Sequence, residues 1–375
     1  MKNISLILIG CGGVGRQLLR HIVACRDLHS NQRVRLRVIG VADSKSMVVA
    51  TEAVMGELED GVIDEICRIK SDGGSLSALE SNGSYQVLSG SNLTIELIEI
   101  ARAVAGLTGL AVIDCSASSD TIEVLKKLIG LGCCTVLANK KPLTSSMEEY
   151  DQLVSHTRHL RHESTVGAGL PVIVSINRLI SSGDTISLVV GSLSGTLGYV
   201  LSEMEDGKPF SEVVRTAKDL GFTEPDPRDD LGGMDVARKA LIIARLLGHR
   251  INLEDIEVES LYPQEMGPNT MASEKFLSDG LPLLDTDFKL RVRRAALKGR
   301  VLRYVCMIGG SRLKVGIQEF PKSSPLGRLK GSDNLIEIYS RCYKEQPLVI
   351  QGAGAGNDTT AAGILADILD LQDIF

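Results

Sequence analysis

The chain has 375 residues, and at about 150 residues per domain this length predicts two or three domains with substantial cores. Hydrophobic residues make up 43% and charged residues 23%, with 38 glycines, which excludes a disordered, collagenous or coiled-coil protein. The net charge is -6, only 3% of the residues are aromatic and none is tryptophan. A nucleic-acid partner is therefore not expected.

The cysteines and the N-terminal residues bear on the cellular compartment. Eight cysteines are scattered through apolar segments without a C-x-x-C pair, which predicts buried free thiols in a reducing compartment. No apolar stretch reaches the roughly 18 residues of a membrane span. Residues 1–9 lead directly into a strand pattern and leave no room for a signal peptide. We expect a soluble, cytoplasmic protein with no membrane partner.

The first third of the chain alternates strand and helix patterns. Strands are predicted at 4–9, 34–42, 110–115 and 133–138, and helices at 14–23, 93–104 and 121–129. The Gly- and Ser-rich segment 71–84 is predicted to be a loop. Apolar strands separated by helices indicate a parallel sheet covered on both faces. The fold class is therefore α/β, with a Rossmann-type dinucleotide-binding domain over residues 1–160.

The pattern changes after residue 160. A helix at 171–180, a strand at 185–191, three helical stretches within 194–248 and strands within 301–320 predict a second, α+β domain over residues 161–345. Residues 348–356 read as a strand and glycine loop, followed by a helix at 359–371. We expect residues 346–375 to return to the first domain.

A glycine-rich loop follows the first predicted strand and opens the first helix. In this context a G-x-G-x-x-G sequence lets the backbone approach a pyrophosphate held at the helix N-terminus. A tight strand-to-helix turn without a ligand is the alternative. The residues of this loop are Gly10, Cys11, Gly12, Gly13, Val14 and Gly15.

The end of the second predicted strand bears on cofactor choice. Asp43 stands where a carboxylate would bind the ribose 2′-hydroxyl of NAD, whereas Lys45 could meet the 2′-phosphate of NADP. The choice between NAD and NADP stays open at this point.

An acidic segment precedes a helix that carries a lysine. Residues 223–231 hold four carboxylates, which suits a metal ion or an ammonium group but also an ordinary solvated loop. Asp235 and Lys239 stand four residues apart on one face of the next helix, where a surface ion pair is the common interpretation. Because that helix is largely apolar, we expect Lys239 to be partly buried and suited to proton transfer.

Three further segments are candidates for ligand binding. Asn139 and Lys140 follow a strand at the carboxyl edge of the predicted sheet, where α/β sheets bind ligands; a basic turn is the alternative. Glu163 precedes the turn 167–171, which could bind a cation through carbonyls or simply begin a helix. The loop 352–356 could meet an anion or a nicotinamide.

Taken together, these segments resemble the homoserine dehydrogenases, especially the fungal and plant branch. The acidic run followed by Asp-Val-Ala-Arg-Lys is the most specific of them. The segments lie in the family's order over nearly the whole chain, at 10–15, 139–140, 163–171, 195–197, 221–231, 235–239, 329–334 and 352–356.

The resemblance implies roles for individual residues. Glu224 should hold the substrate ammonium, Asp230 and Asp235 should shape the substrate site, and Lys239 and Lys140 should stand at the reacting centre. The cofactor would be NADP or NAD, and the loop at Gly356 would close over nicotinamide and substrate. A structural sodium ion is also implied. The implied cofactor-binding residues also include Ser116 and Lys140, and the implied sodium ligands are Glu163, Val166, Ala168 and Leu170.

The implied reaction is the reversible, NAD(P)-dependent interconversion of L-homoserine and L-aspartate 4-semialdehyde, within threonine, methionine and isoleucine biosynthesis, by a homodimer. Lys239 would serve as the general acid and base, with Lys140 holding charge near the reacting oxygen or the substrate carboxylate. An aldehyde-oxidising dehydrogenase would need a nucleophilic cysteine, and Cys133 and Cys134 stand inside an apolar strand. The remaining alternative is a nucleotide-binding sensor or scaffold without catalysis.

Overall fold

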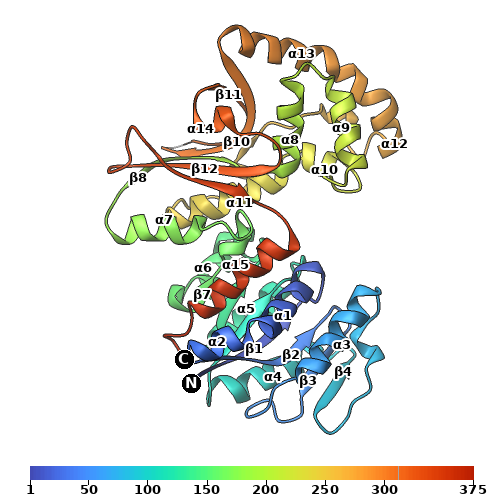
Figure 1. The fold of residues 1–375 in the computed structure, drawn as a ribbon, viewed down its shortest axis with the longest axis vertical. Helices are drawn as coiled ribbons and strands as arrows, with labels where there is room; N and C mark the ends of the chain where they lie inside the picture. Colours follow the sequence, from blue (N-terminus) through green and yellow to red (C-terminus); the bar gives the residue numbers. More distant parts are fainter. Residues whose placement is uncertain (311) are drawn as a thin grey trace. The chain divides into compact units, whose positions relative to one another are not determined.

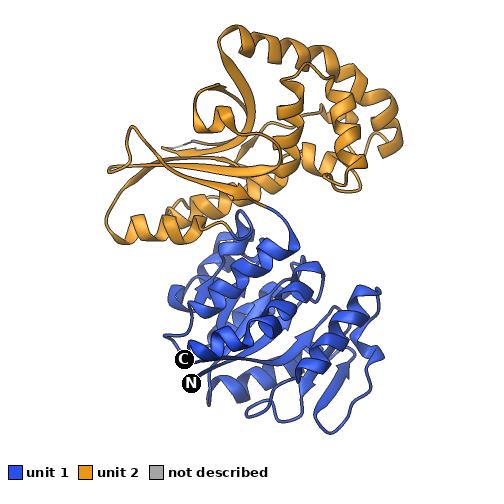
Figure 2. Cartoon of the chain, in the orientation of Figure 1, with its two compact units in different colours: residues 1–169, 355–375 blue, residues 170–354 orange. Residues whose placement is uncertain are grey.

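The computed structural model describes residues 1–310 and 312–375. The chain forms two compact units (Figure 2). Unit 1 comprises residues 1–169 and 355–375, and unit 2 comprises residues 170–354. Within the described residues, no helix combines the length and apolar character that crossing a membrane requires.

Unit 1 is built on a mixed sheet with the strand order β4-β3-β2-β1-β5-β6-β7. The neighbouring strands β2, β1, β5, β6 and β7 are parallel, as predicted. The strands β3 and β4, at one end of the sheet, run antiparallel to their neighbours. The sequence did not reveal these two strands because each is only five residues long. The bounds are β1 Lys2–Ile9, β2 Val34–Ala42, β3 Ser46–Ala50, β4 Tyr85–Ser89, β5 Leu110–Asp114, β6 Cys134–Leu137 and β7 Leu160–Arg161.

Helices cover both faces of this sheet. Along β1, Leu6 and Leu8 join a core with α1, α3 and α15, whereas Ile7 joins a core with α4 and α5 on the other face. The C-terminal helix α15 packs beside α1 (Figure 1). The helices are α1 Gly13–Ala24, α2 Arg26–Asn31, α3 Asp60–Ser71, α4 Leu93–Ala105, α5 Thr121–Gly130, α6 Met147–Leu153 and α15 Asn357–Leu369.

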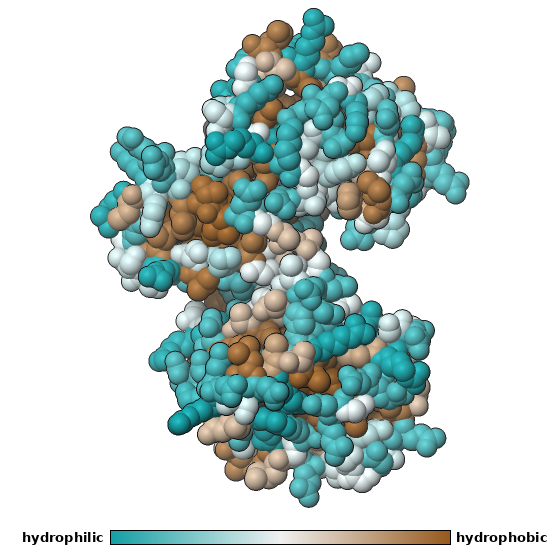
Figure 3. All heavy atoms as spheres, in the orientation of Figure 1, coloured by the Kyte–Doolittle hydropathy of each residue, from teal (hydrophilic) through white to brown (hydrophobic). Residues whose placement is uncertain are grey.

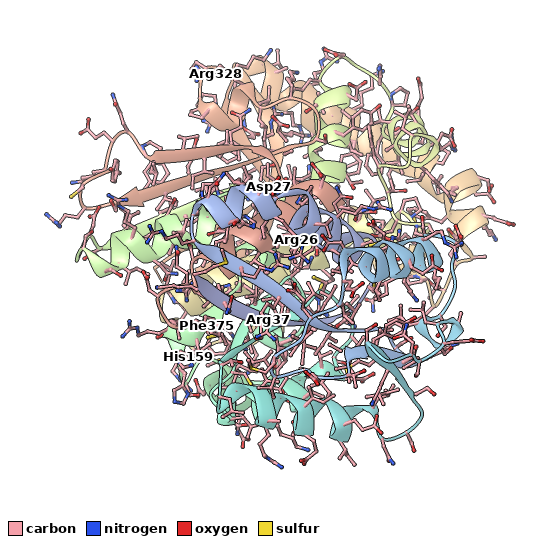
Figure 4. The ribbon with its side chains drawn as sticks, turned by 60° about the horizontal axis from the view of Figure 1, so that its bottom comes forward. Arg26, Asp27, Arg37, His159, Arg328 and Phe375 are labelled. Atoms are coloured by element: carbon pink, nitrogen blue, oxygen red, sulfur yellow. The ribbon has the colours of Figure 1, made fainter. Side chains whose placement is uncertain are left out.

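Hydrogen bonds and the packing of the C-terminal residue connect peripheral segments of unit 1. Arg26 donates to Asp60 at 2.7 Å, and the buried Arg37 donates to the carbonyl of Val54 at 3.0 Å. Both arginines are labelled in Figure 4. Phe375 lies against Gly109, where any Cβ would come within 2.4 Å of its ring. The last residues of the chain are therefore part of the packed structure of unit 1.

Unit 2 is built on a sheet with the order β13-β12-β8-β10-β11-β9, antiparallel except for the pair β11-β9. Helices α8, α11 and α13 pack against β10, and α14 contributes Leu326 to a separate cluster with Val190 and Val305. The strands are β8 Ile186–Ser192, β9 Glu257–Val258, β10 Arg300–Gly309, β11 Arg312–Pro321, β12 Asp333–Ser340 and β13 Leu348–Ala353. The helices are α7 Val172–Ser181, α8 Gly195–Met204, α9 Phe210–Asp219, α10 Arg228–Leu231, α11 Met234–Leu246, α12 Ser273–Lys275, α13 Leu281–Leu297 and α14 Pro325–Arg328.

The boundaries between the units differ from the expected ones. We expected residues 346–375 to return to the first domain, but β13 pairs with β12 in the sheet of unit 2, so only residues 355–375 return. The first boundary lies after residue 169 instead of residue 160. An apolar strand fits either sheet, and its partner is decided by pairing that the sequence pattern does not encode.

Candidate active site

The glycine-rich loop connects β1 to α1, as the motif predicts, and its glycines meet different constraints. Gly10 has φ +94°, and a Cβ there would lie 2.6 Å from the backbone nitrogen of Ser116. A Cβ on Gly15 would lie 2.2 Å from the Gly10 carbonyl oxygen, whereas one on Gly12 would meet nothing within 4 Å. The close approach of the main chain therefore requires glycine at positions 10 and 15, whereas the space beside Gly12 is open.

A pocket of about 490 Å³ opens at this loop, a size typical of cofactor sites. It lies at the carboxyl ends of β1, β2 and β5, the edge at which α/β sheets bind nucleotides. Four of the predicted cofactor residues line it, namely Gly10, Gly12, Asp43 and Ser116. Its other lining residues include Lys70, to which the sequence analysis gave no role.

Asp43 is almost fully engaged by groups of its own unit. Its Oδ1 accepts from the backbone N–H groups of Lys45 and Ser46, both at 2.9 Å, and from the Ser46 hydroxyl at 3.1 Å. Its Oδ2 accepts from the Lys70 ammonium at 2.9 Å and from the Leu76 N–H at 3.1 Å. Burial by itself raises the pKa of Asp43, but these donors outweigh it and lower the pKa to about 2.

Asn139 and Lys140 lie where the sequence placed them, just after β6. The buried Asn139 amide donates to Asp114 at 3.0 Å and to the Ser118 carbonyl at 2.7 Å, and Asp114 also accepts from Thr121 at 2.8 Å. This network joins the ends of β5 and β6 and fixes the main chain that carries the half-buried Lys140. Asp114 was missed because nothing in its sequence context marks it.

The turn after Glu163 is shaped by the C-terminal helix. Glu163 is buried, and its N–H donates at 2.9 Å to Asp367 of α15, whose pKa burial raises to about 8. Ala168 has φ +56°, a left-handed conformation unusual for a residue with a Cβ. Glu163, Val166 and Ala168 thus stand in one ordered turn of unit 1, whereas Leu170, the fourth predicted sodium ligand, begins unit 2.

Lys239 of unit 2 is a buried lysine with two polar partners. It is buried in α11, and its ammonium donates to the carbonyl of Leu193 at 2.7 Å and lies 2.8 Å from Oδ2 of Asp235. The predicted pairing of these two side chains and the predicted burial of the lysine are both found. Asp235 is half-exposed, so the ion pair reaches from the protein interior to its surface.

The acidic segment divides into two parts with different partners. Asp226 pairs with the buried Arg228 and so belongs to the scaffold. Asp230 instead accepts from the Glu224 N–H at 2.8 Å and from the Thr196 hydroxyl at 3.1 Å. Burial and the nearby carboxylates of Glu224 and Asp235 raise the pKa of Asp230. This half of the segment, with the exposed Glu224, suits a cationic ligand group.

The glycine loop after β13 meets a buried amide. A Cβ on Gly354 would lie 1.9 Å from Nδ2 of Asn334, so only glycine fits there. Gly356, with φ +121°, precedes α15 and belongs to unit 1. The predicted loop is therefore the connection that leads from unit 2 back to unit 1.

The cysteines do not offer a nucleophile in the strand predicted to hold two of them. Burial raises the pKa of Cys133 to about 12 and that of Cys134 to about 11, which keeps both as neutral thiols. Cys342 is an exception to the expectation of buried thiols, because it is exposed.

A glycine loop of the dinucleotide-binding type at the carboxyl edge of the sheet of unit 1 is the arrangement found in nucleotide-dependent dehydrogenases. The family model of homoserine dehydrogenase matches residues 171–369. The chain is also 35% identical over 391 residues to the homoserine dehydrogenase of Paracoccidioides brasiliensis, covering 99% of this chain and 98% of that protein. The chain belongs to the homoserine dehydrogenase family, an oxidoreductase family, as its motifs predicted.

Other relatives extend the comparison. The chain is 35% identical over 372 residues to the bifunctional aspartokinase/homoserine dehydrogenase of Haemophilus influenzae, covering 98% of this chain but 43% of that protein. It thus spans about two fifths of that bifunctional relative. A solved Candida auris protein of unknown function superposes with TM-score 0.85 at 31% identity, covering 100% of this chain and 99% of that one. A hyperthermophilic archaeal homoserine dehydrogenase in complex with NADPH shares the fold, with TM-score 0.72 at 21% identity, over 100% of this chain and 98% of that one.

Proposed function

We propose that this chain catalyses the NAD(P)-dependent, reversible interconversion of L-homoserine and L-aspartate 4-semialdehyde. The observation that carries the proposal is the buried Lys239, held between a carbonyl and Asp235 in a chain of this family. Bound NAD(P) supplies the hydride donor or acceptor. The protein supplies proton transfer, charge and orientation.

Lys239 moves the proton of the reacting oxygen. In the reductive direction its ammonium donates a proton to the aldehyde oxygen as the carbon is reduced, and Asp235 at 2.8 Å holds the ammonium in place beforehand. In the oxidative direction the same nitrogen accepts the hydroxyl proton. Lys140 holds positive charge near the reacting oxygen or the substrate carboxylate.

The acidic segment binds the substrate ammonium. Glu224 is exposed and Asp230 is held by Thr196 and by the Glu224 backbone, so the two carboxylates present negative charge in one place. Partial burial and the neighbouring carboxylates raise the pKa of Asp230. A bound ammonium would relieve the repulsion between these negative charges. Arg228 of the same segment is paired with Asp226, so substrate binding would supply the positive charge for Glu224 and Asp230.

We further propose that NADP is the preferred cofactor. Both oxygens of Asp43 already accept from protein donors, which leaves no lone pair in good geometry for a ribose 2′-hydroxyl. Lys70 lines the same pocket with its ammonium on Asp43, and Lys45 stands two residues beyond. These two cations suit a 2′-phosphate, and the NADPH bound by the archaeal relative supports the proposal.

The remaining expectations concern sodium and assembly. One buried carboxylate together with the carbonyls of an ordered turn is a donor set suited to a hard cation, and we propose that Glu163, Val166, Ala168 and Leu170 hold Na⁺ there. We also propose a homodimer. The cytoplasmic location stays a prediction of the sequence.

The test follows the absorbance of reduced nicotinamide with purified protein, L-homoserine and either NAD or NADP at alkaline pH, where alcohol oxidation is favoured. Growth of signal, faster with NADP, is the expected result. A protein that binds a nucleotide but turns over no homoserine with either one would instead be the sensor alternative. Thermal stabilisation by nucleotide alone, without any added effect of homoserine, would be its signature.

A further inference from the structure

A hollow of about 500 Å³ in unit 2 is lined by residues from the end of α13 and from the strands β10 and β11. Its volume is in the range of small-ligand sites. Four basic side chains line it, namely Arg291, Arg294, Lys298 and Arg300. The helix runs along the margin of unit 2 (Figure 1), where hydrophilic residues surround scattered hydrophobic ones (Figure 3). The hollow thus gathers positive charge on a chain whose net charge is -6.

The basic side chains converge on the hollow from two elements. Those of α13 and the turn after it are three and four residues apart, so they share one side of the helix. Cations near a helix C-terminus also stabilise the helix dipole, which would explain these three alone. Arg300, however, is the first residue of β10, and the buried Leu302 on the same side of that strand lines the hollow with the buried Ile317 of β11. Cations from helix and strand therefore surround an apolar patch.

One of the four cations is fixed by the scaffold. Arg291 donates to Glu259 at 2.8 Å, and its guanidinium lies 5.7 Å from the centroid of the Phe288 ring. The second carboxylate oxygen of Glu259 accepts from the N–H of Ile317 at 2.9 Å, so this carboxylate joins α13 to β11. Arg291 is thus neutralised in place, and the other three cations decide the charge of the hollow.

These three cations share one carboxylate. Glu319 is the only acidic side chain among the described residues that line the hollow. Lys298 donates to it at 3.1 Å, and the buried Nε of Arg300 lies 3.8 Å from it without a hydrogen-bond partner in the described structure. Arg294 is exposed and, within the described part of the chain, forms neither an ion pair nor a hydrogen bond. Three positive charges against one negative charge leave a surplus of two.

We propose that this hollow binds a polyphosphate group, either as a free polyphosphate or as the tail of a nucleotide. The planar guanidinium group of arginine pairs with phosphate oxygens through two parallel hydrogen bonds, and several cations around one hollow suit a ligand with several negative charges. Leu302 and Ile317 offer an apolar surface for a base. The site is separate from the glycine-rich loop, because all its residues belong to unit 2. The inference does not depend on the proposed reaction.

Isothermal titration calorimetry of the full chain tests the proposal, with sodium tripolyphosphate and ATP as probes in buffer without magnesium. Excess NADPH is present throughout to occupy the pocket of unit 1. We expect one molecule of probe to bind per chain. Arg294→Glu should weaken binding at least about tenfold, because it removes a paired cation and adds a repulsive charge. The matched control is Arg293→Glu, an equal change of charge at an exposed neighbour outside the hollow, which should change the affinity by less than about twofold.

A second variant and the two probes sharpen the result. Lys298→Ala, at another exposed position, should weaken binding about threefold or more, because it also frees Glu319 to repel the ligand. Circular dichroism checks that both variants are folded. Tighter binding of ATP than of tripolyphosphate would identify a nucleotide as the ligand, and equal or weaker binding would identify free polyphosphate. Absence of binding by both probes would overturn the site, and so would equal affinities of the Arg294 variant and the wild type.

Discussion

Unit 1 and unit 2 each contain a carboxylate that the sequence analysis assigned to a binding site, but the surroundings of the two carboxylates have opposite effects on their pKa values. Asp43 of unit 1 is saturated by donors of its own unit, which lower its pKa to about 2. Asp230 of unit 2 is partly buried, and its pKa is raised by this burial and by the neighbouring carboxylates of Glu224 and Asp235. A carboxylate that accepts hydrogen bonds from several protein donors holds its loop in place. A carboxylate that lies beside other carboxylates favours binding of a cation. Under the proposed function, the nucleotide site is therefore formed before binding, whereas the substrate site gains its missing positive charge from the ligand.

The largest effect should come from the proton carrier. Lys239→Met should lower kcat by about a thousandfold, because the variant keeps the side-chain length but cannot move a proton. Its affinity for nucleotide, measured by fluorescence of the reduced cofactor, should stay within about twofold. The exposed Lys275→Met in the same unit serves as the control. Wild-type turnover by the Lys239 variant would remove it from the mechanism.

The next effect compares the two carboxylates directly. Asp230→Asn should raise KM for homoserine about a hundredfold, because a charged hydrogen bond to the substrate ammonium is lost. Asp43→Asn should leave that KM unchanged, and so should Asp229→Asn beside the site. If Asp43→Asn raised KM for homoserine as much as Asp230→Asn, the division of labour between the units would be wrong.

Lys70 should affect the cofactor alone. Lys70→Ala should raise KM for NADP by about thirtyfold and change KM for NAD by less than about threefold, since only NADP carries the 2′-phosphate. Steady-state kinetics with both nucleotides measures the ratio, with Lys127→Ala as a distant control. An equal loss with both nucleotides would show that Lys70 acts by holding Asp43.

The smallest effect is on stability at low pH. The pKa of Asp43 is depressed in the folded state, so its contribution is present above the unfolded value near 3.8 and is lost as the pH falls through about 2. Asp43→Asn should remove about 1–2 kcal/mol at pH 6 and much less at pH 2.5. Urea unfolding at the two pH values measures the difference. A loss of equal size at both would mean that the charge of Asp43 contributes nothing.

The sequence predicted those features that depend on neighbours along the chain. The glycine loop at Gly10, the end of β2 at Asp43 and the pair Asp235 and Lys239 follow from spacing within one strand, turn or helix. Lys70 could not be predicted, because it meets Asp43 from the end of a helix 27 residues away. Asp230 was predicted from resemblance alone, and its bond to Thr196 spans 34 residues. Such contacts arise only when the sheet has brought the segments together.

The pairing of strand β13 also could not be predicted from residues that are neighbours along the chain. Its apolar pattern predicts a strand equally well in either sheet, and pairing with β12 places it in unit 2. The strands β3 and β4 were missed because their pairing, more than their composition, makes them strands.

The return of α15 to unit 1 also affects how the chain folds while it is synthesised on the ribosome. Ile364, Ile368 and Leu371 complete the same core that Leu6 and Leu8 of β1 begin. The core around β1 therefore cannot close until residue 371 has been synthesised, and the whole of unit 2 is made between these two segments. During translation unit 2 can fold first, and a nascent chain stalled before α15 would expose the apolar face of the nucleotide half to chaperones and proteases.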